Sequence, residues 1–122
     1  CCGYPDKIDE VDYPKAPLEI YKKISKKLDN SIIDVISIED AHRYNDEDLF
    51  KNFLNTKLIL GVIKIASSKI ETEDEIEDRI KNILKYIDKE RLILAPDCGL
   101  GYLSRELAKK KLSVMTNVAK KF

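Results

Sequence analysis

Short apolar runs alternate along the chain with amphipathic segments of helical period, and this alternation limits the fold more than any other feature. The runs are rich in Ile, Leu and Val, are too short for helices, and cover residues 32–38, 58–63 and 91–95. The middle run is almost continuously apolar, which is typical of a strand buried on both faces of a sheet. Strands that alternate with helices predict parallel βαβ units. We therefore expect an α/β fold.

Four helices are expected around these strands, because apolar residues recur at helical spacing before, between and after them. N-terminal signals stand at Pro17, in the Asn-Asp-Glu-Asp run 45–48, at Thr72 with Glu75, and at Ser104. Thr72 and Glu75 form a capping-box pattern. The inner face of the last helix is predicted at Ala108, Leu112, Met115, Ala119 and Phe122.

Three βα units would make a poor complete domain, because both edges of their sheet would be open. They fit the last three-eighths of a TIM (β/α)8 barrel, or one part of a doubly wound sheet. We expect residues 1–122 to be the C-terminal fragment, about three βα units, of a single barrel domain. The chain begins with Cys1 and not with Met, as expected of an excerpt from a longer protein or of a processed product.

The charges and the longest apolar runs exclude several classes of protein. The chain has 22 Lys+Arg and 22 Asp+Glu, for a net charge of +0, whereas a nucleic-acid binder carries a basic excess. The lysines at 109–111 are expected on a solvated helix face. No apolar run reaches the roughly 18 residues of a membrane-spanning helix, and no signal peptide opens the chain. We expect no nucleic-acid or membrane partner and a cytoplasmic location.

Chemistry in a barrel collects at the C-terminal ends of the strands. Here Glu39, Asp40 and His42 follow the first expected strand, and Asp97 and Cys98 follow the third. Thiolate, carboxylate and imidazole groups that converge suit Zn²⁺. The alternatives are a Glu39 that pairs with a neighbouring arginine, a Cys98 that is a small buried thiol, and a His42 in a solvated loop that does not orient substrate.

The other two cysteines, Cys1 and Cys2, precede the first helix, where an earlier strand of a barrel would end. The total of 3 cysteines is odd and too small for a disulfide framework. Free thiols or metal ligands are therefore expected, and all of these positions could face one mouth of the barrel.

Five short segments carry a family resemblance. They are Asp-Val-Ile-Ser-Ile-Glu at 34–39, Ile-Leu-Gly-Val at 59–62, Ile-Glu-Thr at 70–72, Glu-Arg-Leu at 90–92 and Pro-Asp-Cys-Gly-Leu at 96–100. Together they resemble the C-terminal catalytic barrel of cobalamin-independent methionine synthase, and most of all its short single-barrel relatives. The likeness extends from Cys1 to about Ala119, and the Pro-Asp-Cys-Gly-Leu run is its most specific part.

The resemblance implies a zinc site made of a His-x-Cys pair, a Glu and a Cys. The Glu corresponds to Glu39 and the last Cys to Cys98. The Cys of the pair corresponds to Cys1, or to Cys2 if the register is one residue off, and the His would lie before residue 1. Asp97, beside Cys98, is expected to hold a ligand through a hydrogen bond.

The activity implied is zinc-dependent methyl transfer from 5-methyltetrahydrofolate, as its polyglutamate, to homocysteine, which gives methionine. Coordination to zinc would deprotonate the homocysteine thiol, whose unperturbed pKa is ~8.5. The implied partners are these two small molecules and the rest of the barrel. Two alternatives remain: a zinc methyltransferase with another donor or thiol, such as a methyl-corrinoid protein or coenzyme M, and a non-catalytic metal-binding module.

Overall fold

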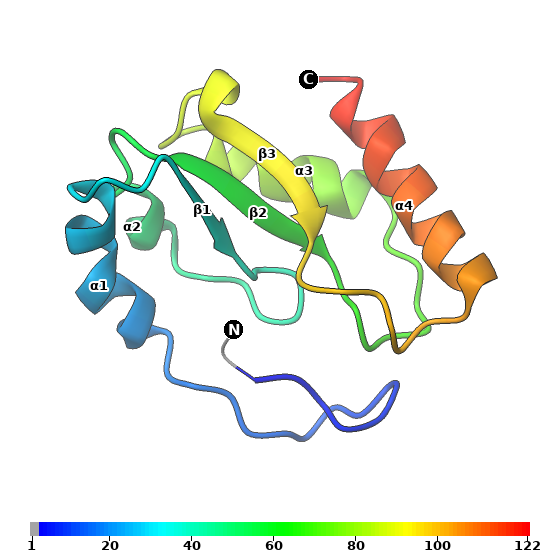
Figure 1. Ribbon diagram of the computed structural model, residues 1–122. Helices are drawn as coiled ribbons and strands as arrows, with labels where there is room; N and C mark the ends of the chain where they lie inside the picture. The colour runs from blue at the N-terminus through cyan, green and yellow to red at the C-terminus, as the bar shows by residue number, and fades with distance from the viewer. Residues whose placement is uncertain (1–2) are drawn as a thin grey trace.

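The computed structural model of the chain describes residues 3–122. The elements, in chain order, are α1 (Glu19–Asp29), β1 (Val35–Ile38), α2 (Glu47–Phe50), β2 (Lys57–Ile63), α3 (Glu73–Ile83), the short 3₁₀ turn η1 (Lys89–Arg91), β3 (Leu92–Pro96) and α4 (Arg105–Ala119). The strands form one parallel sheet in the order β1-β2-β3 (Figure 1). This confirms the predicted α/β fold with parallel βαβ units.

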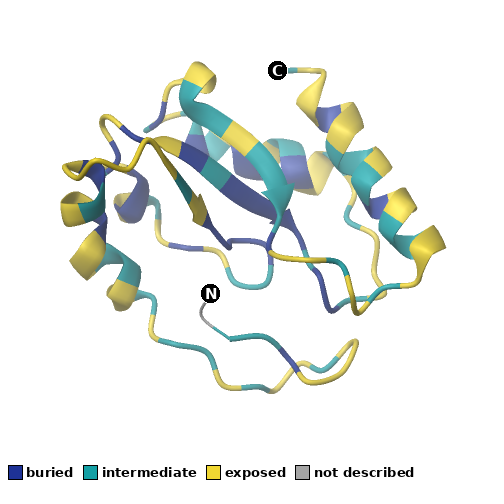
Figure 2. Ribbon diagram, viewed as in Figure 1, coloured by how far each residue is buried: buried dark blue, intermediate teal, exposed yellow. Residues whose placement is uncertain are grey.

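The hydrophobic core lies between the sheet and the helices that follow β1 and β2. Strand β2 is the most buried strand (Figure 2), as its continuous apolar run predicts. The stripe of α3 packs against it through Ile76, Ile80 and Ile83, which are at most 2% exposed. The edge strands are more open: Val35 on β1 is 40% exposed and Ile93 on β3 is 43% exposed. Among residues 3–122, no helix is both long and apolar enough to cross a membrane.

The local signals at the helix starts are confirmed for α3 and α4. The Thr72 side chain accepts a hydrogen bond from the N–H of Glu75, and the Glu75 carboxylate accepts one from the N–H of Thr72. Ser104 accepts from the N–H of Leu107 in the same way. These caps depend on residues three positions apart, so the local sequence is sufficient to predict them.

The first βα unit differs from its prediction in detail. Strand β1 begins at Val35 and not at residue 32, and Ile32 is 99% exposed. Helix α1 begins at Glu19, while the Pro17 carbonyl closes a turn with the N–H of Ile20. The pairing with β2 starts at Lys57, which is in register with Val35 and donates its N–H to the Asp34 carbonyl, so residues 32 and 33 precede it. The apolar pattern alone does not reveal where the partner strand begins.

The inner face of helix α4 agrees with its prediction in part, because Met115 and Phe122 pack against the hydrophobic core. Its buried residues are Lys111 and Val118, whereas Ala119 is exposed. Lys111 is completely buried, and its ammonium group lies 2.9 Å from a carboxylate oxygen of Glu71 and donates to the Lys69 carbonyl. The prediction that this lysine faces solvent is therefore wrong, because a buried acceptor pair compensates its charge while its stem packs as an apolar chain.

Candidate metal and substrate site at the strand ends

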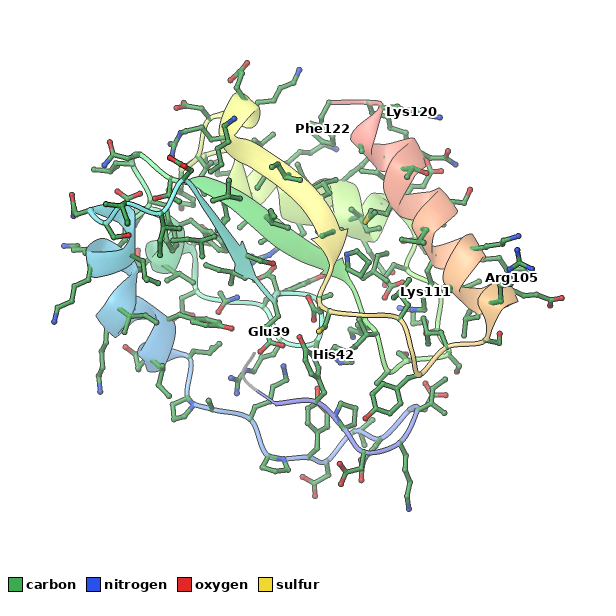
Figure 3. The ribbon with its side chains drawn as sticks, in the orientation of Figure 1. Glu39, His42, Arg105, Lys111, Lys120 and Phe122 are labelled. Atoms are coloured by element: carbon green, nitrogen blue, oxygen red, sulfur yellow. The ribbon has the colours of Figure 1, made fainter. Side chains whose placement is uncertain are left out.

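The expected chemical residues gather at the C-terminal edge of the sheet. Figure 1 shows the N-terminal segment, residues 3–17, crossing this edge below the tips of the three strands. In Figure 3, Glu39 and His42 lie between the strand ends and that segment. The loop that follows β1, residues 39–45, is thus covered by the N-terminal segment, residues 3–17.

Asp40 fixes this loop from inside the protein. Its carboxylate forms a two-pronged pair with Arg79 of α3, with Nε–Oδ2 at 2.6 Å and Nη2–Oδ1 at 2.8 Å, and it also accepts from the backbone N–H of Asn45 at 2.8 Å. The Asp40 side chain is completely buried and that of Arg79 is 9% exposed. A buried pair with this geometry holds its two partners in one arrangement. Asp40 therefore anchors the loop to α3.

Asp97 holds the same loop from the end of β3. Its Oδ1 accepts the backbone N–H groups of Asp40 and Ala41, both at 2.9 Å, and its Oδ2 accepts that of His42 at 2.8 Å. Burial raises the pKa of the Asp97 carboxyl above its ordinary value, while the three N–H donors act in the opposite direction. Gly61 on β2 leaves the space that this carboxylate fills. The described contacts of the Asp97 carboxylate are thus to backbone next to Glu39; whether it also acts on a metal ligand stays a prediction.

Glu39 lies directly after β1 and is 7% exposed. Its Oε2 is 3.7 Å from the Nζ of Lys15, and both side chains are almost fully buried. The alternative partner, Arg43, instead donates to the carbonyl of Ala16. Glu39 therefore forms an ion pair with a lysine of the N-terminal segment, 24 positions away.

Cys98 is a free and exposed thiol two residues after β3, so the alternative of a small buried thiol is wrong. Its neighbour Asp97 connects this position with the loop that carries Glu39. Tyr4 donates to the carbonyl of Asp97 at 3.1 Å, and its pKa is raised by burial, by the Glu39 carboxylate, and by the charges of Asp97 and Cys98. Asp97 thus joins the backbone beside Glu39 to the strand end beside Cys98, and Tyr4 is bonded to the same residue.

His42 is held between two loops, so the alternative of a solvated loop position is wrong. Its Nε2 accepts the backbone N–H groups of Ile65 at 3.0 Å and Ala66 at 3.3 Å, so the proton of the neutral ring sits on Nδ1, 3.3 Å from the Tyr13 hydroxyl. Burial, followed by the positive charges of nearby lysines, lowers the pKa of His42 to about 4. Both ring nitrogens of His42 thus form hydrogen bonds with described residues. The neutral ring connects the two loops, and neither nitrogen is available to bind a metal.

The N-terminal segment carries functional candidates that the sequence did not reveal. Its backbone is tied to the loop after β2: the N–H of Asp9 donates to the Ala66 carbonyl, and the Asp9 carboxylate accepts the N–H of Ser68 at 2.7 Å. No periodic pattern marks residues 3–17, so only their composition could have drawn attention to them. The side chains of this segment that reach the site are Tyr4, Tyr13 and Lys15.

The donor atoms at this edge fit a zinc ion only in part. Glu39 offers a carboxylate oxygen and Cys98 a thiol sulfur, which are both accepted zinc ligands. Cys1 and Cys2 lie outside the described residues, and within residues 3–122 no group of three or more His, Cys, Asp or Glu side chains is placed to hold a metal. A zinc site that uses Glu39 and Cys98 would therefore need further ligands from outside the described residues.

Three parallel βα units with polar residues at the C-terminal ends of their strands are typical of α/β proteins, the α/β barrels among them, whose chemistry lies at this edge of the sheet. Residues 18–121 match the protein family described as the catalytic domain of cobalamin-independent synthase. A solved structure agrees: a B12-independent methionine synthase from Shewanella sp. W3-18-1, in complex with selenomethionine, has a TM-score of 0.77 and 30% identity. The match covers 82% of this chain and 29% of that one. The chain belongs to the cobalamin-independent methionine synthase family, and it has the fold of three βα units of its TIM barrel.

Curated methionine synthases from archaea have a similar sequence identity to the chain. The one from Thermococcus kodakarensis is 31% identical over 93 residues, which are 75% of this chain and 28% of that protein. The one from Pyrococcus abyssi is 33% identical over 101 residues, which are 82% of this chain and 30% of that protein. The chain thus spans less than a third of the length of the relatives it matches.

Proposed function

We propose that residues 1–122 are the C-terminal βα units of a methionine-synthase barrel. The whole barrel would transfer a methyl group from 5-methyltetrahydrofolate, as its polyglutamate, to the sulfur of homocysteine. Family membership supports the reaction class, and the short span relative to the relatives supports the assignment as a part of a barrel. The remaining units would supply most contacts to the two substrates.

The observation that carries this proposal is that Glu39 follows β1 and Cys98 follows β3 at one edge of a parallel sheet, where Asp97, beside Cys98, accepts the N–H of Asp40, beside Glu39. Strands β1 and β3 are the two outer strands of the described sheet. One carboxylate and one thiol at a strand edge of this family are the donors expected for zinc. With Cys1, or Cys2 in its place, they would hold the ion.

Bound zinc would supply a Lewis acid that keeps a coordinated thiol deprotonated at neutral pH. This chain's own residues would provide the frame for that chemistry. Asp97 and Asp40 hold the loop after β1, so that Glu39 projects from a fixed backbone. Tyr4, from the N-terminal segment, donates to the Asp97 carbonyl and would hold that segment against the site. Free thiol ligands persist in reducing compartments, so the proposal includes a cytoplasmic location.

The test uses the natural polypeptide that carries these residues, because the substrate contacts are expected outside them. The purified protein is incubated with homocysteine and 5-methyltetrahydrofolate triglutamate, and methionine is quantified by mass spectrometry. We expect methionine to form, and the Cys98→Ser variant to lose both bound zinc and activity, because a hydroxyl group is a much poorer zinc ligand than a thiolate.

Parallel reactions with methylcobalamin as donor, and with coenzyme M as acceptor, distinguish the other zinc methyltransferases. Product in one of these reactions and none with homocysteine and methyltetrahydrofolate would replace the proposed substrates. Full zinc content and full activity in Cys98→Ser would remove Cys98 from the site.

A further inference from the structure

A buried lysine stands next to the carboxylate that the proposed site needs for its metal. The Nζ of Lys15 is 3.7 Å from the Oε2 of Glu39, and the two side chains are only 8% and 5% exposed. Charges removed from water to this degree are tolerated when they are paired. The carboxylate and the ammonium group thus compensate each other in this structure.

Two aromatic rings fix the ammonium group in this position. Its Nζ lies 5.4 Å from the ring centroid of Tyr4 and 5.8 Å from that of Tyr13, which is within the range of cation–π attraction. Tyr4 is held by the Asp97 carbonyl, and Tyr13 by the ring of His42. The ammonium group therefore lies near two aromatic rings and the Glu39 carboxylate.

A divalent cation bound to Glu39 would lie close to this ammonium group. Like charges repel at such distances, and partial burial strengthens the repulsion because water screens it less. Lys15 is on an irregular segment and has a long, flexible side chain, so it can move away without any change in the sheet. The metal and the ammonium group are thus alternative counter-charges for one carboxylate.

We propose that Lys15 occupies the cation position beside Glu39 while no metal is bound, and that the metal displaces it. This inference rests on the proposed zinc site and assigns to Lys15 a role in setting the affinity of that site. In the metal-free state the lysine neutralises Glu39 and keeps residues 3–17 closed over the strand ends. The same contact lowers the affinity for Zn²⁺, because binding must break it.

The test compares Zn²⁺ affinities of the natural polypeptide and its variants by competition with a chromophoric chelator. Lys15→Met removes the charge but keeps the length of the side chain, and we expect it to bind Zn²⁺ roughly 10-fold more tightly than the unmodified protein. Lys15→Arg keeps the charge and is expected to stay within about 2-fold. Lys85→Met is the matched control, because it changes the net charge equally while its ammonium group donates to Asn82 at the end of α3. Circular dichroism verifies the fold of each variant.

A second measurement follows the lysine itself. An amine-reactive label, read by mass spectrometry, should modify Lys15 several-fold faster after Zn²⁺ is added, whereas labelling of the exposed Lys69 should not change. Equal Zn²⁺ affinity in Lys15→Met and the unmodified protein, with unchanged labelling, would overturn the role of Lys15 and leave the zinc site intact. If none of the proteins binds Zn²⁺, the proposed zinc chemistry and this inference both fail.

Discussion

A Cβ atom on Gly61 would lie 2.0 Å from Oδ1 of Asp97, so the glycine of β2 and the carboxylate after β3 share one space. Because of this fit, the Asp97 side chain can turn back across the end of β2 and reach the loop after β1. Asp97 thus joins strands β2 and β3 to the loop after β1, at the edge of the sheet where the chemistry of a barrel is expected. The absence of a side chain at Gly61 on β2 therefore helps to set the position of Glu39, through Asp97 and the backbone of Asp40.

Replacing Gly61 by Ala should expel the Asp97 carboxylate and leave three backbone N–H groups without their acceptor. Buried donors that lose their acceptors are costly, so we expect a loss of about 2–4 kcal/mol in the free energy of unfolding. Urea titration of the natural polypeptide measures it. Gly101→Ala is the matched control, since a Cβ there has nothing within 4 Å, and it should change stability by less than about 0.5 kcal/mol. Equal stabilities of the two variants would contradict the proposed fit.

The helix caps could be predicted from the sequence, whereas the hydrogen bonds of Asp97 to the loop after β1 could not. The Thr72–Glu75 capping box and the buried strand β2 follow from neighbouring residues, and both were predicted. The Asp97–Ala41 hydrogen bond joins residues 56 positions apart. No local pattern encodes such a contact, because it depends on the order and register of the strands.

In the candidate site, too, the sequence predicts some residues and not others. Glu39 and Cys98 stood out because they follow apolar strands, and a family resemblance gave them roles. Lys15 and Tyr4 were missed because residues 3–17 have no periodicity, and their importance arises only when the segment folds over the strand ends. Burial of Lys111 was mispredicted since its partner, Glu71, is 40 positions away.

His42 should make the stability of the protein depend on pH. Its pKa is about 4 in the folded chain, against an ordinary value of 6.5, so the unfolded chain binds more protons between these values. The folded state therefore loses stability as the pH falls from about 6.5 to 4, and His42 has no such effect above about pH 7. Because the ring is only partly buried, solvent screening reduces the full effect to about 1–2 kcal/mol.

Urea titrations at pH 7 and pH 4.5 measure this effect. The variant His42→Gln cannot titrate and keeps an acceptor for the N–H groups of Ile65 and Ala66. Its stability difference between the two pH values should be smaller than that of the unmodified protein by about the amount above. The same difference in both proteins would assign the pH dependence to other groups.

Asp40→Asn should lower the free energy of unfolding, because Asp40 acts on the fold and is not assigned to the metal. The substitution leaves the buried Arg79 without its counter-charge, and breaking a buried pair in this way typically costs about 3–5 kcal/mol. Thermal unfolding followed by circular dichroism gives the measurement. A loss below about 0.5 kcal/mol, the range of a surface substitution, would mean that the Asp40–Arg79 pair does not anchor the loop.

The 122-residue chain by itself should be inactive. The edges of its sheet, β1 and β3, carry exposed apolar residues such as Val35 and Ile93, and open edges of this kind promote association. We expect aggregation or oligomers in size-exclusion chromatography, together with weak zinc binding. A monomeric 122-residue protein that unfolds cooperatively and transfers methyl groups would contradict the assignment as part of a barrel.

Zinc content after replacement of single carboxylates tests whether Glu39 holds the metal, because Glu39 is the carboxylate among the described residues that we propose as a zinc ligand. Glu39→Gln and Glu47→Gln are the same substitution, but Glu47 lies at the start of α2 and accepts a hydrogen bond from Tyr86. Metal analysis of the purified natural polypeptide should find most of the zinc lost in Glu39→Gln and retained in Glu47→Gln, because a neutral amide cannot replace a carboxylate ligand. Equal zinc content in the two variants would mean that Glu39 is not a zinc ligand and that the proposed metal site is wrong.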